Sequence, residues 1–526
     1  MIALLRVPNP TEAYRSSLPL LREAAGMRPV SFVAMLTEVL GLPAVYSPNL
    51  DLAHPIVGVL VEGDPMGLAL AIHVNNGREM VAALSTGRSP SHRARVMSGG
   101  LTLLEPLTKS PALALSLGVI GNALVVGVQG VELEVYAPHL RVQLSAAGEH
   151  PGPAPPLGAL EIVVPGALLR GVAAGRIEAE WKDWRGRLEG QALELRDKRG
   201  READFASPAA VLDGADELVG EIVRVARSAQ GARVLVELQP HAVAGRLELE
   251  SGDKGAAREL VHGLAGGDVN GLLALPRGVG AGCLFRSTAK GRLESSHRAM
   301  RFADKLFGSR LDAPSRTVLD AAMSATARGR GDDLVVGLIP AADGWVVVAS
   351  ATVVDDEALD RGVRGILRSL SAPAFAEPLV RFLGRPHVGF DTAQIPEAGG
   401  TASRARIRWE RPSAPNPPTD VLWRIESGRL MLAVGPSAAD GLVALIEAAS
   451  DPAASLAARD DVQAGLARAG DEVAMACFWP PTHPSAAMAG GPPAPAVLSV
   501  GRAAKRAMLR LELPTVDLLA LFREQR

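Results

Sequence analysis

Short apolar runs separated by turn residues recur along this chain, and they recur in the same order in its two halves. Residues 56–84, IVGVLVEGDPMGLALAIHVNNGREMVAAL, have the pattern of strand, turn, strand, polar break and helix. Residues 335–367, VVGLIPAADGWVVVASATVVDDEALDRGVRGIL, have the same succession. Near the end of the second segment, Val363, Ile366 and Leu367 have the spacing of one apolar helix face.

The two halves also begin and end alike. The opening run ALLRV contains Arg6, and the later run CLFRS has the same shape, so that Arg6 matches Arg286. A helical pattern follows each run and ends at a glycine, Gly26 or Gly308, the common residue just past a helix. Near the ends of the halves, VLVELQP before GRLELES matches VAMACFWP before AMLRLELP. This shared order predicts a tandem duplication.

The repeat predicts the fold class and the domains. We expect an α+β protein with two tandem, structurally similar domains, each with antiparallel sheets and helices packed on them. The first domain is predicted over residues 1–268, with a helical insertion at about 166–230. The second is predicted over residues 269–526, with Pro-rich loops at about 411–420 and 480–496.

One uncharged run is long enough to cross a membrane. It is SPALALSLGVIGNALVVGVQGV, residues 110–131. Its counterpart in the second half, residues 421–449, carries Arg424, Glu426 and Arg429 in the same pattern, and each would cost about 2.5–3.5 kcal/mol inside a bilayer. The Gly-Asn pair is a turn signal. We therefore predict a β-hairpin over residues 113–127 rather than a transmembrane helix.

Composition places the chain among ordinary globular proteins. It has 526 residues, 48% hydrophobic and 21% charged, with a formal net charge of −2. Because no basic block or stripe occurs, nucleic acid is not an expected partner. Cys283 and Cys477 each lie in an apolar, strand-like run, and the simplest expectation is two buried, reduced thiols, although one bridge between them is possible. The first residues lack the features of a signal peptide.

The patterns ALLRVPNP, VGVL followed by GLALAI, and GNALVVG leading into a helix resemble a group of large exported bacterial proteins of unknown function. These are envelope proteins, often lipoproteins, of high-GC-content bacteria. The resemblance covers most of the chain as a hydrophobic pattern. It implies a periplasmic or envelope-associated location, and it transfers no functional residue.

Motifs that carry chemistry do not emerge from the sequence. No Walker sequence, GxSxG elbow, HExxH motif or Cys/His zinc spacing occurs, so we assign no catalytic residue, cofactor or metal ligand. The acidic run at Asp355 is best explained as the first turn of a helix. Asp332 and Asp333 precede a strand and are predicted to be turn residues.

Two pairs of residues remain as candidate contacts. Trp181 and Trp184 lie near one face of the helical insertion, which either packs on its own domain or meets a partner, since Trp is enriched at binding hot spots. Arg6 and Arg286 either form structural ion pairs or bind an anion in each half.

The leading functional hypothesis is a non-enzymatic binding or scaffold protein of the bacterial cell envelope. It would hold a hydrophobic small molecule between or within its repeats, or bind a protein partner. Two alternatives stay open: a hydrolase-like enzyme with scattered acidic residues, and a cytosolic structural or interaction protein.

Overall fold

The chain is α+β, with antiparallel sheets and helices packed on them, as predicted. The computed structural model describes residues 2–25, 31–63, 66–87, 90–107, 115–147, 159–199, 208–239, 242–307, 311–342, 344–372, 384–396, 399–410, 418–470, 472–480 and 495–514. Gly26, Gly308 and most of the two predicted Pro-rich loops, 411–417 and 481–494, lie outside these residues.

The described residues form two compact units. The first draws on Met1–Ala173, Gln230–Glu250 and Leu511–Arg526, and the second draws on Ala174–Ala229 and Ser251–Arg510. The predicted boundary near residue 268 concerns the sequence repeat, and it stays a prediction.

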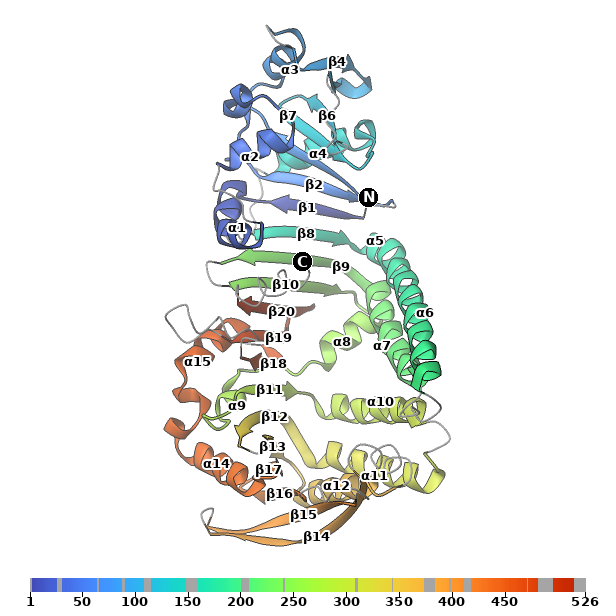
Figure 1. Ribbon diagram of the computed structural model, residues 1–526, viewed down its shortest axis with the longest axis vertical. Coiled ribbons are helices and arrows are strands. Elements are labelled where there is room, and N and C mark those ends of the chain that lie inside the picture. Colours follow the sequence, from blue (N-terminus) through green and yellow to red (C-terminus); the bar gives the residue numbers. More distant parts are fainter. Residues whose placement is uncertain are drawn as a thin grey trace. The chain divides into compact units, whose positions relative to one another are not determined.

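The first unit contains a long antiparallel sheet and the helices that flank it. Its elements are β1 (Ala3–Val7), α1 (Pro10–Ala25), α2 (Phe32–Val39), β2 (Ile56–Val61), β3 (Gly67–His73), α3 (Gly77–Thr86), β4 (His92–Val96), β5 (Leu101–Pro106), β6 (Leu115–Ile120), β7 (Ala123–Val128), α4 (Leu133–Ala147), β8 (Ala159–Pro165), α5 (Gly166–Leu168), and most of β9 (Ala229–Leu238) and β10 (Ala242–Ser251). The strands pair in the order β9–β8–β1–β2–β3–β7–β6–β5–β4 (Figure 1).

The second unit repeats this strand order. Its elements are α6 (Ala174–Arg199), α7 (Pro208–Ser228), α8 (Ala256–Gly263), α9 (Asn270–Leu273), β11 (Ala281–Arg286), α10 (Ala289–Phe307), α11 (Ala313–Gly329), β12 (Arg330–Ala341), β13 (Gly344–Val353), α12 (Asp356–Ser369), β14 (Arg385–Ile395), β15 (Gly400–Glu410), β16 (Thr419–Glu426), β17 (Arg429–Gly435), α14 (Ala438–Ser450), α15 (Asp460–Leu466), β18 (Val473–Trp479), β19 (Ala496–Ala503) and the first part of β20 (Arg506–Pro514). The strands pair in the order β19–β18–β11–β12–β13–β17–β16–β15–β14. Each strand from β1 to β9 thus has a counterpart ten numbers higher.

Two helix caps fix which residues correspond. Asn76 caps α3 and Asp355 caps α12, and each side chain accepts a hydrogen bond from the backbone N–H three residues on. Capping at Asp355 was predicted from sequence. Three residues before these caps lie His73 and Thr352, which pair with the first residues of β7 and β17. His73 and Thr352 are therefore equivalent positions in the two strand orders.

The same register corrects the predicted match of Arg6 with Arg286. Two residues before the equivalent pair, the partners of β3 and β13 are Val57 on β2 and Val335 on β12. Their own partners on β1 and β11 are Arg6 and Leu284. Arg286 lies two residues further along β11. A shift of two residues along a strand leaves every side chain on the same face of the sheet, so the apolar pattern alone did not reveal the error in the match.

The predicted match of the strand ends was also shifted by one strand. VAMACFWP forms β18, whose counterpart by pairing is β8, and the strand that matches β9 is β19. The chain between β18 and β19 was expected to be a Pro-rich loop up to residue 496, and β19 begins at Ala496. Asp332 and Asp333 were predicted in a turn, but both lie inside β12.

The described part of the long uncharged run, from residue 115 on, contains a hairpin, which confirms that prediction; residues 113 and 114 lie outside the described residues. β6 and β7 pair antiparallel from Leu115 opposite Val128 to Ile120 opposite Ala123. The turn between them uses Gly121 at a φ of 59°, a left-handed conformation that glycine adopts without strain. Among the described residues, no helix is both long and apolar enough to cross a membrane.

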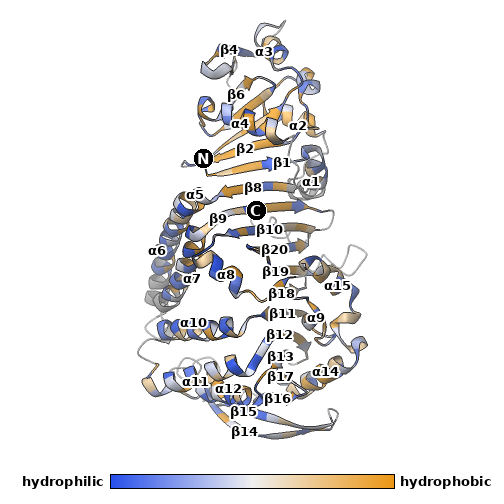
Figure 2. Ribbon diagram, turned by 180° about the vertical axis from the view of Figure 1, so that it is seen from behind, coloured by the Kyte–Doolittle hydropathy of each residue, from blue (hydrophilic) through white to orange (hydrophobic). Residues whose placement is uncertain are grey.

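Equivalent helices cover both faces of each sheet. In the first unit α4 packs on β2, β3 and β7, while α3 packs on the other face; in the second unit α14 and α12 hold these places. Figure 2 shows β1, β2 and β8 as largely hydrophobic strands. The residues that join helix to sheet are Leu133, Leu140 and Val125; Met80, Leu84 and Ile72; Leu442, Leu445 and Val348; and Leu359, Ala351 and Trp423.

The two cysteines form a disulfide, which corrects the expectation of reduced thiols. Cys283 on β11 lies directly opposite Cys477 on β18, and the bridge joins residues 194 apart in the sequence. At the equivalent place in the first half, Leu5 on β1 lies opposite Ile162 on β8. An apolar cross-strand pair in one half is thus replaced by a covalent bond in the other.

Candidate functional site

A small pocket in the second unit combines polar and apolar walls. It opens among α9, β12, β13, β17 and α14. Its lining consists of Gly271, Ala274, Asp333, Val335, Ser350, Ala351, Thr352, Arg429, Met431, Leu445 and Ala449. Pockets with an apolar wall and a few converging polar groups are typical of ligand sites.

Strand register brings the polar and apolar side chains of this pocket together. Ser350 on β13 lies opposite both Val335 on β12 and Met431 on β17. Two residues along, Thr352 lies opposite Arg429. Because side chains two apart on a strand share a face, both rows point into the same hollow. Polar and apolar side chains therefore line one small hollow.

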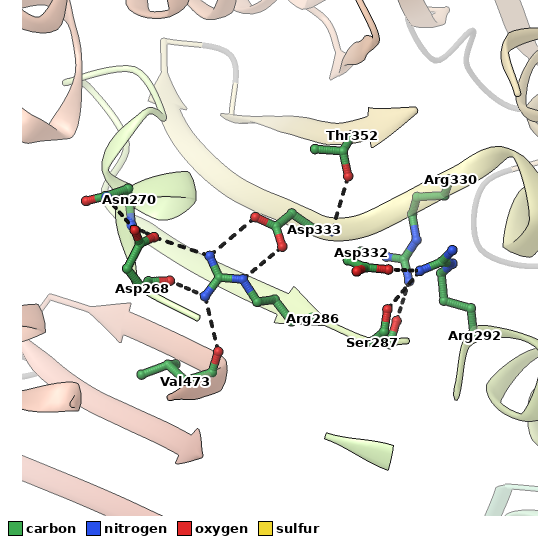
Figure 3. Close-up of polar contacts among 10 residues, drawn as sticks. All are labelled: Asp268, Asn270, Arg286, Ser287, Arg292, Arg330, Asp332, Asp333, Thr352 and Val473. Carbon is green, nitrogen blue, oxygen red and sulfur yellow. Dashed lines mark hydrogen bonds and ion pairs between the residues drawn. The ribbon is translucent and has the colours of Figure 1, made fainter. Parts of the chain in front are cut away.

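Arg286 forms the buried polar cluster beside this pocket (Figure 3). Its Nε and Nη2 donate to the two carboxylate oxygens of Asp333 at 2.8 and 3.3 Å. Nη1 donates to the backbone oxygens of Val473, at 3.2 Å, and of Asp268, and Nη2 also reaches Asp268 Oδ1 at 3.4 Å. The side chain is only 8% exposed. These contacts occupy all five N–H groups of the guanidinium, so Arg286 holds β11, β12 and β18 together.

Two further arginines, Arg330 on β12 and Arg292 on α10, lie near Arg286 (Figure 3). Arg292 donates to Asp332 Oδ1 at 2.5 Å, to Ser287 O at 2.8 Å and to Ala327 O at 3.0 Å. Arg330 donates to Ser287 Oγ at 3.1 Å. Burial lowers the pKa of Arg330 below its usual value, and the positive charge of Arg292 lowers it further. The guanidiniums of Arg292 and Arg330 therefore both interact with Asp332 on β12.

Arg6, the other arginine proposed from sequence, lies in the first unit and in a different setting. It is on β1, opposite Val57 on β2 and Glu161 on β8. Arg6 and Arg286 belong to different units and to positions that the register does not match, so they do not form a repeated pair of sites.

The two tryptophans of the helical insertion point different ways. Trp181 on α6 donates from Nε1 to Asp216 Oδ1 on α7 at 2.6 Å. Arg185 reaches Asp213 at 2.7 Å, and it also bonds Asp216. Trp184 is 54% exposed, with the Arg187 guanidinium 5.5 Å from its ring centre. Trp181 thus packs α6 on its neighbouring helix, and Trp184 is the side chain that remains available at the surface.

Sequence reasoning missed the pocket and one further cluster. The pocket residues come from five elements that are spread along the chain, and their two-residue spacing on β13 and β17 carries no chemical signature. The cluster is in the first unit, where Asp51, His54 and His73 bring three potential metal ligands within 4.8 Å of one another. An Asp-x-x-His spacing beside a strand ending in His was the signal that was available.

Comparisons with known proteins add little. No protein-family model matches the chain, and no curated protein matches it. Among solved structures, crystal form III of TP0453 is 7% identical and covers 50% of this chain and 82% of that chain, with a TM-score of 0.23. Crystal form IV of TP0453 is 7% identical and covers 47% of this chain and 76% of that chain, with a TM-score of 0.22. Similarity this weak says nothing about what this chain does.

Proposed function

We propose that this chain is a non-enzymatic binding or scaffold protein of the bacterial cell envelope. The observation that carries the location is the disulfide between Cys283 and Cys477. Disulfides form and persist in oxidising compartments such as the periplasm, whereas the cytosol keeps thiols reduced. The sequence resemblance to exported envelope proteins points the same way.

The ligand we propose is a small molecule with an apolar body, held within the second unit. Val335, Met431 and Leu445 would pack against the apolar part. The hydroxyls of Ser350 and Thr352 would meet its polar end, since hydroxyls both donate and accept hydrogen bonds. This places the hydrophobic ligand within one repeat, in a pocket that strand pairing has already built.

The hydrolase alternative gains no support from the acid in this pocket. Asp333 is the carboxylate among the lining residues, and it bonds Arg286 through both oxygens. A general acid or base must exchange its proton with substrate. A carboxylate held by two hydrogen bonds from a buried guanidinium is poorly suited to that exchange.

Native mass spectrometry of the protein purified from its host tests the binding proposal. Wild type should retain a small molecule. Ala449→Trp, at the exposed rim of the pocket, should release it, because the indole would occupy the opening. Ala439→Trp is the matched control, since Ala439 is exposed on the same helix and does not line the pocket. A wild-type protein that retains neither ligand nor partner, or equal retention by both variants, contradicts the pocket.

A further inference from the structure

The side chains of Asp51, His54 and His73 converge in the first unit. Asp51 and His54 lie in the loop before β2, and His73 is the last residue of β3. Asp51 Oδ2 is 2.7 Å from His54 Nδ1 and 3.2 Å from His73 Nδ1. The two imidazole rings are stacked, with centroids 4.1 Å apart. One oxygen and two nitrogens therefore lie within 4.8 Å of one another.

Backbone contacts hold this arrangement in place before any ligand arrives. The Asp51 N–H donates to the carbonyl of His73 at 2.9 Å, and the neighbouring residues Leu50 and Val74 form an isolated β-bridge. Asp51 Oδ1 accepts from the N–H of Ala53 at 3.1 Å, which leaves Oδ2 directed at the histidines. The loop is thus fastened to the end of β3 by its main chain.

The Nδ1 atom of His73 has an unmet need for a partner. It is buried, yet it makes no hydrogen bond, because its 3.2 Å contact with Asp51 lacks suitable geometry. A buried polar atom without a partner is unusual and costs free energy. A metal ion placed between the three side chains would satisfy this nitrogen. His54 has 46% of its side chain exposed, so the cluster of Asp51, His54 and His73 is open to solvent.

We propose that Asp51, His54 and His73 bind one Zn²⁺ ion, with its fourth position open. Two imidazole nitrogens and one carboxylate oxygen are a donor set that zinc accepts, and three protein ligands leave one position for water or a ligand group. Ligands at about 2.0 Å from a tetrahedral zinc are about 3.3 Å apart. The 3.2 Å contact between Asp51 and His73 has this spacing, and the 2.7 Å contact between Asp51 and His54 is about half an ångström shorter. Because the two rings are stacked, the half-exposed His54 ring has to turn for both nitrogens to reach one ion.

The equivalent positions in the second half, which the structure describes, do not form a corresponding site. The β-bridge of Leu50 with Val74 corresponds to the pairing of Arg330 with Val353, which places Asp51 at the position of Gly331 and His73 at that of Thr352. A Cβ at Gly331 would come within 2.3 Å of the Thr352 hydroxyl, so that position has no room for a ligand side chain. The zinc site is a property of the first unit alone.

Calorimetric titration of the full chain with zinc chloride, after treatment with EDTA, tests the proposal. Wild type should bind one Zn²⁺. His54→Ala should weaken binding by more than about tenfold, the loss typical of changing even an outer-shell residue. Asp51→Asn and His73→Ala should do the same, and His297→Ala, an exposed histidine on α10, should bind as wild type does.

Cobalt(II) added in place of zinc gives an independent spectral readout. We expect the absorption of a low-symmetry, four-coordinate ion in wild type and its loss in His54→Ala, a substitution at a half-exposed position that the fold should tolerate. Circular dichroism checks the fold of each variant. Absence of zinc binding in wild type, or unchanged affinity in folded His54→Ala, would overturn the assignment.

Discussion

Removing the disulfide should destabilise the second unit by a calculable amount. The perturbation is the double substitution Cys283→Ala and Cys477→Ala, compared with oxidised wild type. The bridge closes a loop of 194 residues, and in the chain-entropy model a loop of that length contributes about 5 kcal/mol by restricting the unfolded state. Both cysteines belong to the second unit, so the first unit should keep its stability.

The expected change in melting temperature follows from the size of that unit. It has roughly 300 residues, and unfolding entropy of about 2.1 cal/mol/K per residue gives about 0.6 kcal/mol/K. A loss of about 5 kcal/mol then lowers its melting temperature by about 8 °C. The structure thus predicts a shift confined to the transition of one unit.

Differential scanning calorimetry with and without a reductant measures this shift. Reduced wild type should melt near the double variant, and adding reductant to the double variant should change nothing. Hydrogen exchange should show unaltered protection in the first unit. If oxidised wild type and the double variant melt within about 2 °C of each other, the bridge does not stabilise the fold in the way we infer.

Three further outcomes are expected. Arg286→Met should cost about 3 kcal/mol in urea unfolding, because it leaves the Asp333 carboxylate without its partner; a loss below about 1 kcal/mol would contradict the role of Arg286 in joining the strands. Leu5→Cys with Ile162→Cys should form a second cross-strand disulfide on oxidation, since this pair is equivalent to the natural bridge, and free thiols in the oxidised variant would disprove the register. Burial lowers the pKa of His92, so the unfolded chain takes up a proton at this residue more readily than the folded chain, and the free energy of unfolding should fall as pH drops below about 6.5. His92→Gln, measured in EDTA, should make the free energy of unfolding depend less steeply on pH. Equal pH dependence in wild type and variant would show that His92 is not responsible.

The apolar pattern predicted the class of the fold because strand pairs and amphipathic helices leave strong periodic signals. The hairpin of β6 and β7 could be inferred from its Gly-Asn turn and from the charged counterpart in the second half. The helix cap at Asp355 could be inferred because an acid before an apolar helix face has one common explanation.

Register and long-range pairing could not be read from the same pattern. A slip of two residues keeps the faces of a strand unchanged, and the predicted match of Arg6 with Arg286 failed for that reason. The disulfide escaped prediction because Cys283 and Cys477 are far apart in sequence, and only the neighbourhood of β11 and β18 brings them together. The pocket and the histidine cluster depend on such long-range neighbours as well.

We infer from the shared strand order that the two halves arose by duplication; the second half has a covalent bond between two neighbouring strands where the first half has the apolar pair Leu5 and Ile162. The location we propose depends on that bond being present in the cell. A protein of the envelope should carry it in the cell, and a protein of the cytosol should not.

The most direct measurement is to trap the thiols in intact host cells with an alkylating agent and to analyse the unreduced protein by mass spectrometry. The proposed location predicts one linked peptide pair containing Cys283 and Cys477, with neither residue alkylated. Recovery of both cysteines as separately alkylated peptides would contradict the disulfide in the cell and, with it, the proposal that this is an envelope protein.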